Sequence, residues 1–113
     1  MSTAPTLRTL SDLAEAGLIA SEQIAGLEQV AEQYAIAITP ALVELIRPGD
    51  ADDPIGAQFL PSKAELRIES FESADPVGDA AHSPVEGIIH RYPDRALLKI
   101  THTCAVYCRF CFR

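Results

Sequence analysis

The sequence lacks tryptophan, and it has no cysteine before position 104 and no long uninterrupted apolar run. Its three cysteines lie close together near the C-terminal end and have no partners elsewhere, so they do not suggest a disulfide framework. Metal binding in a reducing compartment is the better interpretation. The apolar stretches are too short to cross a bilayer, and residues 1–10 lack the basic and apolar segments of a secretory signal. We therefore expect a cytoplasmic protein that does not associate with membranes.

Acidic residues outnumber basic ones, and the net charge of -7 argues against a general nucleic-acid surface. The basic residues nevertheless gather in the final stretch, where only Asp94 opposes Arg91, Arg95, Lys99, Arg109 and Arg113. They either alternate with apolar residues around a strand or form an anion site, because guanidinium groups bind phosphate and carboxylate in a bidentate manner. The neighbouring cysteines favour the anion site.

Apolar residues at helical spacing predict three helices in residues 1–50. The first helix is expected to end near Gly17, the second to be capped by Ser21, and the third to begin at Thr39-Pro40. The predicted apolar faces comprise Leu10, Leu13, Ala14 and Leu18, then Ile24, Leu27, Val30, Ala31 and Tyr34, then Leu42, Val43, Leu45 and Ile46.

The composition changes after residue 50. Residues 51–87 are rich in Pro, Gly, Asp and Ser, which predicts an extended arm or linker. Within it, residues 61–71 are compatible with a short helix or a strand. Residues 95–101 form a short apolar run that predicts a buried strand leading directly into the cysteine loop. We therefore expect three parts, at 1–50, 51–87 and 88–113, with the metal loop at a strand end where α/β barrels place active sites.

Cys104, Cys108 and Cys111 have the spacing Cx3Cx2C. Four cysteines saturate an ordinary electron-transfer cluster, whereas three thiolates leave one iron of a cubane cluster open for another ligand. This spacing is typical of the radical S-adenosylmethionine (SAM) enzymes, in which the open iron binds SAM. A structural zinc module is the alternative from another class, with His82, His90 or His102 as the fourth ligand.

Longer runs of sequence narrow this interpretation. Residues 75–78 and 83–95, followed by the cysteine loop, resemble the lysine 2,3-aminomutase family of the radical SAM superfamily, and so do residues 53–55 and 58–62. The first half resembles that family only in its general helical character. The resemblance implies an α/β fold, in which a helical N-terminal region and an extended arm lead into the first strand and cluster loop of a partial TIM-type barrel. The chain is then expected to be a truncated, N-terminal fragment.

The family resemblance also implies an activity. Members convert L-lysine to β-lysine with a [4Fe-4S] cluster, SAM and pyridoxal phosphate (PLP), so a small amino acid, most simply lysine, is the expected partner and the full-length enzyme is expected to be a homo-oligomer. This fragment is expected to be inactive alone, because neither Lys63 nor Lys99 matches the family's PLP lysine. An enzyme that makes β-lysine for attachment to a translation elongation factor, or an aminomutase for glutamate or arginine, stays an alternative.

The same resemblance assigns roles to individual residues. Cys104, Cys108 and Cys111 match the cluster ligands, and Phe110 matches a position near the adenine of SAM or, equally, one that packs the loop. Arg113 matches the arginine that holds the substrate α-carboxylate. The implied PLP residues are Arg91, Tyr92 and Arg95, where for each arginine contact with the phosphate and plain salt bridging stay open.

Overall fold

The structure, a computed structural model, describes residues 4–111. Their contacts divide them into two compact units. The helical unit comprises the chain up to Ile68 together with Cys104–Cys111, and the hairpin unit comprises Glu69–Thr103. Helices and strands are both present, as expected, whereas the barrel implied by the family resemblance stays a prediction.

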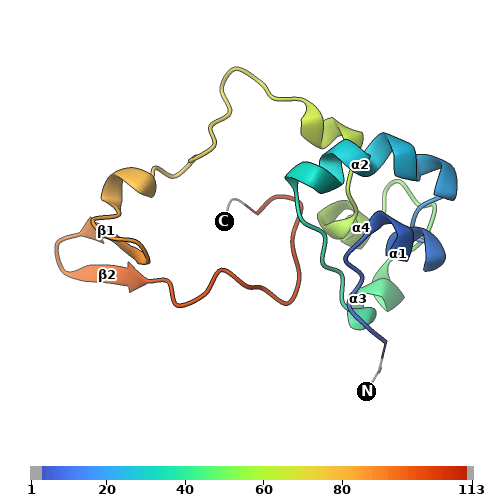
Figure 1. The fold of residues 1–113 in the computed structure, drawn as a ribbon, viewed down its shortest axis with the longest axis horizontal. Helices are drawn as coiled ribbons and strands as arrows, with labels where there is room; N and C mark the ends of the chain where they lie inside the picture. The colour runs from blue at the N-terminus through green and yellow to red at the C-terminus, as the bar shows by residue number, and fades with distance from the viewer. Residues whose placement is uncertain (1–3, 112–113) are drawn as a thin grey trace. The chain divides into compact units, whose positions relative to one another are not determined.

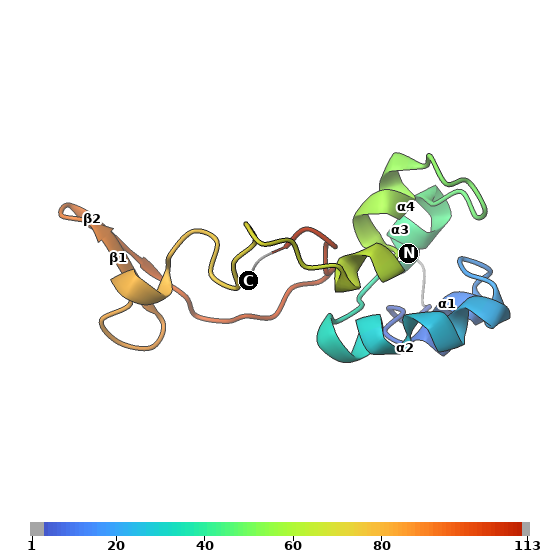
Figure 2. The same cartoon turned by 90° about the horizontal axis from the view of Figure 1, so that it is seen from above.

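The helical unit is built from short helices around one apolar core (Figure 1). Its helices are α1 (Leu10–Glu15), η1 (Ser21–Gln23), α2 (Ile24–Gln33), α3 (Pro40–Leu45), α4 (Pro54–Phe59) and η2 (Lys63–Leu66), where η marks a 3₁₀ helix. Figure 2 shows α1 beside α2. Leu7 and Ile38 form an isolated antiparallel bridge that ties the N-terminal segment to the chain after α2. The buried core consists of Leu10, Leu13, Leu18, Leu27, Val30, Ile36, Ile38, Ile46 and Phe59.

The three predicted helices are confirmed, with changes at their ends. Gly17 follows the end of α1 with φ 76°, a left-handed conformation that glycine adopts without a steric cost. Ser21 is not the cap of α2, because it lies inside η1, and the side chain of Gln23 accepts the Ala20 N–H instead. Leu45 is 59% exposed, so its assignment to the apolar face of the third helix is wrong.

The segment expected to be an extended arm contains α4 and η2, so that expectation is wrong for Pro54–Leu66. For residues 61–71 the helical alternative is the correct one, since Lys63–Leu66 is a 3₁₀ turn. Proline at the first position of α4 signals a helix start, but six residues are too few to show helical periodicity. The boundaries of the three expected parts stay a prediction.

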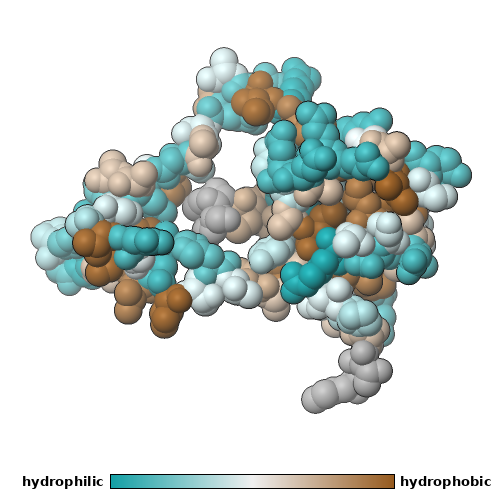
Figure 3. Space-filling model, viewed as in Figure 1, coloured by the Kyte–Doolittle hydropathy of each residue, from teal (hydrophilic) through white to brown (hydrophobic). Residues whose placement is uncertain are grey.

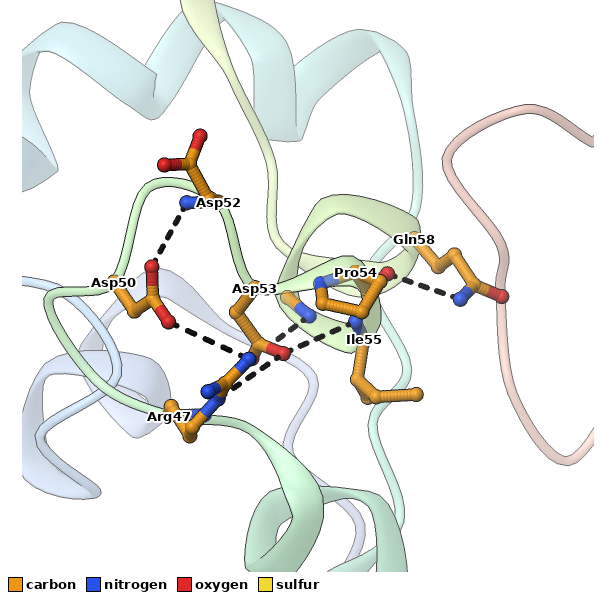
Figure 4. Close-up of polar contacts among 8 residues, drawn as sticks. Arg47, Asp50, Asp52, Asp53, Pro54, Ile55 and Gln58 are labelled. Atoms are coloured by element: carbon orange, nitrogen blue, oxygen red, sulfur yellow. Dashed lines mark hydrogen bonds and ion pairs between the residues drawn. The ribbon is translucent and has the colours of Figure 1, made fainter.

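A buried carboxylate joins α3 to α4 (Figure 4). Asp53 is 3% exposed and caps α4 by accepting the N–H groups of Ile55 and Gly56, at 3.3 and 3.2 Å. It also accepts the N–H of Arg47, just beyond α3, at 2.8 Å, and the Arg47 Nε lies 3.8 Å away. A Cβ at position 56 would lie 3.2 Å from the Asp53 carboxylate, so glycine permits this close approach.

Hydrogen bonding controls the ionisation of Asp53. The N–H of Arg47 does most to hold the pKa of Asp53 below its usual value; desolvation opposes it, and the N–H groups of Gly56 and Ile55 and the charge of Arg47 reinforce it. Because the native pKa is lower than the unfolded one, the carboxylate stabilises the fold above the unfolded pKa of about 4. That stabilisation is lost as the pH falls through the native pKa.

The hairpin unit contains η3 (Ala80–His82) and two antiparallel strands, β1 (Ile88–Tyr92) and β2 (Arg95–Leu98). Pro93 and Asp94 form the turn, and the register pairs Ile88 with Leu98 and Tyr92 with Arg95. A bulge interrupts the pairing between Ile89 and Tyr92. A bulge changes the direction in which nearby side chains point, and this one includes Arg91.

The strand predicted at residues 95–101 is confirmed in part. It ends at Leu98, all four of its residues are exposed, and β1, which the sequence reading missed, pairs with it. The apolar run suggested burial on both faces, but a two-stranded sheet leaves side chains uncovered. Apolar surface is visible on this unit in Figure 3. The exposed apolar residues of the unit include Val85, Leu97, Leu98 and Ile100. Among the described residues, no helix is long and apolar enough to cross a membrane.

The Asp53 carboxylate yields a test of the fold. We expect Asp53→Asn to lower the urea midpoint of the helical unit at pH 7, because a neutral amide has one acceptor oxygen where the carboxylate has two charged ones. The deficit should shrink as the pH falls through the lowered native pKa of Asp53, since the wild-type carboxyl then protonates as well. Asp52→Asn is the matched control, because the exposed Asp52 carboxylate points away from the contacts of Asp53 in Figure 4. Helical circular dichroism measures the midpoints, and a deficit that is constant with pH would contradict the ionisation argument.

Candidate cluster and cofactor sites

The cysteine loop, Cys104–Cys111, packs on the helical unit. Val106 and Cys108 lie against the apolar core of that unit. The Tyr107 N–H donates to the Ala37 carbonyl at 3.1 Å, and the Arg109 N–H donates to the Gln58 carbonyl at 2.7 Å. Residues 99–103, which lie between β2 and the loop, form no helix or strand, so the loop does not follow the strand directly as expected. The local order of the loop thus comes from its contacts with the helical region.

The three thiols are free, and a turn relates two of them. The Cys111 N–H donates to the Cys108 carbonyl at 3.2 Å, which places these residues at the two ends of one turn. Cys104 and Cys111 are exposed and Cys108 is half-buried. Phe110, inside the turn, is 70% exposed. Three thiols in eight residues suit iron–sulfur chemistry, although within residues 4–111 no three Cys, His, Asp or Glu side chains converge as a metal site.

Arg109, between Cys108 and Cys111, is a site residue that sequence reasoning missed, since the sequence placed it only in the basic cluster. Its side chain is 7% exposed. Its Nε donates to Glu65 Oε1 at 2.9 Å and its Nη1 donates to the Ala35 carbonyl at 2.9 Å. Nη2 lies 2.9 Å from the same Glu65 oxygen as an ion pair, without the alignment of a hydrogen bond. A charged residue between two cysteines was the only signal in the sequence, and it did not identify Glu65.

The structure brings together the three residues assigned to PLP by resemblance. Arg91, Tyr92 and Arg95 line a cavity of about 410 Å³ in the hairpin unit. The Arg91 guanidinium pairs with Asp79 at 2.6 Å and also donates to the Val77 carbonyl. The Arg95 guanidinium lies 4.4 Å above the Tyr92 ring, and its ion pair with Asp94 is long, at 3.9 Å. Arg91 is therefore held by a carboxylate, while the charge of Arg95 is the more available. Arg113 lies outside the described residues.

Sequence comparison decides the family. The chain is 38% identical over 107 residues to L-lysine 2,3-aminomutase of Clostridium subterminale, a match that covers 95% of this chain and 26% of the relative. It is 42% identical over 88 residues to L-lysine 2,3-aminomutase of Methanococcus maripaludis, covering 77% and 20%. The chain belongs to the lysine 2,3-aminomutase family. No family model matches it.

The family match extends beyond the motifs that first suggested it. Because it covers 95% of the chain, it includes the helical first half, which had resembled the family only in general character. The chain spans about a quarter of the length of that relative. Glutamate 2,3-aminomutase of Clostridioides difficile is also similar, at 40% identity over 87 residues, 77% of this chain and 20% of the relative.

Proposed function

We propose that this chain forms part of a radical SAM, PLP-dependent 2,3-aminomutase that converts L-lysine to β-lysine. The cysteine loop carries this proposal, because three free thiols at Cx3Cx2C spacing occur in a chain whose relatives are L-lysine 2,3-aminomutases. The enzyme is then an isomerase that moves an amino group within a small amino acid, and a cytoplasmic homo-oligomer stays our expectation for it.

Cys104, Cys108 and Cys111 would hold a [4Fe-4S] cluster and leave one iron for SAM. When bound, the cluster supplies the electron that cleaves SAM and so starts radical chemistry. The exposure of Cys104, Cys111 and Phe110 supports this role, since a SAM molecule needs access to the open side of the cluster. The packing of Val106 and Cys108 on the helical core would fix the loop from its other side.

Arg95, Tyr92 and Arg91 would hold PLP, the group that supplies amino migration when bound. Arg95 is the best partner for the phosphate, because its guanidinium lines the cavity and has only a long ion pair with Asp94. Tyr92 supports the Arg95 guanidinium through its ring. Arg91, held by Asp79, would shape the wall of the cavity and contact the phosphate only if it left that carboxylate.

Lysine is the substrate favoured by the relatives, while the glutamate 2,3-aminomutase makes glutamate the second candidate. An α-carboxylate is common to both, and we propose that Arg113 binds it, because an arginine fork satisfies both of its oxygens.

The first functional prediction concerns the cluster in the full-length protein. Cys108→Ala should lower the iron content and the visible absorption of the anaerobically reconstituted protein and abolish its spectral response to SAM. Tyr107→Phe is the control, since it lies in the same loop and keeps its backbone bond to Ala37. Iron and sulfide assays with visible spectra measure the result. A colourless protein that retains zinc would favour the structural module instead.

The second prediction concerns PLP. Arg95→Gln in the full-length protein should weaken PLP binding by about tenfold or more, because a hydrogen bond to a charged group contributes roughly 1.5–3 kcal/mol. Lys99→Gln removes a positive charge from the same unit but not from the cavity lining, so it should bind PLP as the wild type does. Absorbance titration with PLP measures both affinities. Equal affinities of the two variants would exclude Arg95 from the phosphate site.

The third prediction concerns substrate binding. Arg113→Lys keeps the positive charge but loses the bidentate fork, so KM for lysine should rise sharply while cluster content and uncoupled SAM cleavage persist. Steady-state kinetics with lysine, and the release of 5′-deoxyadenosine without lysine, separate the two effects. Unchanged lysine kinetics would rule out the carboxylate role.

A further inference from the structure

Arg109 connects the cysteine loop to three separate places in the helical unit. Its backbone N–H binds the Gln58 carbonyl in α4, its Nη1 binds the Ala35 carbonyl after α2, and its Nε binds Glu65 in η2. The side chain is 7% exposed, and its contact with Glu65 is partly buried, whereas its contact with Ala35 lies at the surface. One residue between two of the cysteines therefore carries several of the polar ties of the loop.

Glu65 is itself fixed, which makes the connection stiff. Its Oε1 receives Arg109, and its Oε2 accepts the Ser62 N–H at 2.7 Å. The Ser62 hydroxyl accepts the Ala64 N–H at 3.2 Å and so completes the cap of η2. Both oxygens of the carboxylate are in use, and the side chain is only 19% exposed. The Arg109 guanidinium thus meets an acceptor that the local backbone already orients.

We propose that Arg109 is a positioning residue for the cluster, and that Glu65 is its partner in this role. By fixing the 108–111 turn on the helical unit, the pair fixes the directions from which Cys108 and Cys111 would meet the irons. The inference rests on the proposed [4Fe-4S] site. Residues that orient metal ligands control metal affinity and reactivity although they do not touch the metal.

Lysine is not equivalent to arginine in this position. A lysine ammonium keeps the charge that neutralises Glu65, but it is a point charge without the planar fork that reaches Glu65 and Ala35 in two directions. Arg109→Lys therefore separates charge balance from geometry. Glu65→Gln tests the other side of the pair, because its amide oxygen still accepts a hydrogen bond while the charge is lost.

The test uses the full-length protein and three variants, Arg109→Lys, Glu65→Gln and Asp12→Asn. Asp12→Asn is the matched control for Glu65→Gln. It also turns a carboxylate that accepts backbone N–H groups into an amide, but it lies in α1, which supplies none of the acceptors named above for the loop. Hydrogen exchange of the cluster-free protein follows the amides of Tyr107 and Arg109. For the reconstituted protein, electron paramagnetic resonance of the reduced cluster is recorded as SAM is added.

Arg109→Lys and Glu65→Gln should speed exchange at Tyr107 and Arg109, broaden the signal of the reduced cluster, and raise the SAM concentration for half of the spectral change by about tenfold. Asp12→Asn should weaken the start of α1 without these effects on the loop or the cluster. Wild-type exchange and spectra in both loop variants, or the same changes in Asp12→Asn, would overturn the positioning role alone. A wild-type protein that binds no SAM-responsive cluster would overturn the proposed function as well.

Discussion

The attachment of the cysteine loop to the helical unit is the constraint on which the proposed chemistry depends. A loop without helix or strand has backbone N–H groups that need acceptors once they leave water. Here the N–H groups of Tyr107 and Arg109 find the carbonyls of Ala37 and Gln58. These acceptors belong to the segment after α2 and to α4, so the loop adopts its shape only when those parts of the chain are folded. Order in the cysteine loop is in this sense a product of the helical core.

The Arg109–Glu65 pair shows why that attachment is specific rather than merely stable. Removing two charges from water is costly, and a buried ion pair often stabilises a fold no more than apolar residues of the same volume. Such a pair does discriminate strongly between arrangements, because a slip of the loop would leave both charges unpaired in a poorly hydrated place. Because its partners are 44 positions apart in the sequence, this pair selects one long-range arrangement among many compact ones.

Some of these features could be predicted from the sequence, and others could not. The helical spacing of apolar residues, with the residues that start and end helices, sufficed to predict α1, α2 and α3. Leu10, Leu13, Leu27 and Val30 follow this spacing and lie in the core. Helix α4 and strand β1 were missed, since each is short and depends on contacts that the local pattern does not encode. The cysteine spacing predicted a metal loop from the sequence alone. The burial of Arg109 could not be predicted from the sequence, because the sequence around an arginine beside cysteines is the same whether its partner is water or Glu65.

The two units achieve order by different physical means, and this bears on their roles. The helical unit has an apolar core with fully buried residues such as Leu13, Val30 and Ile38, so it can hold the cysteine loop rigidly. In the hairpin unit, a two-stranded sheet with exposed Leu97 and Leu98 has marginal stability of its own. There the polar contacts do the local positioning, with Asp79 holding Arg91 and the Tyr92 ring supporting Arg95. Thus hydrophobic packing supports the residues proposed for the cluster, whereas ion pairing and cation–π contact orient those proposed for PLP, and the latter set should be the more sensitive to ionic strength.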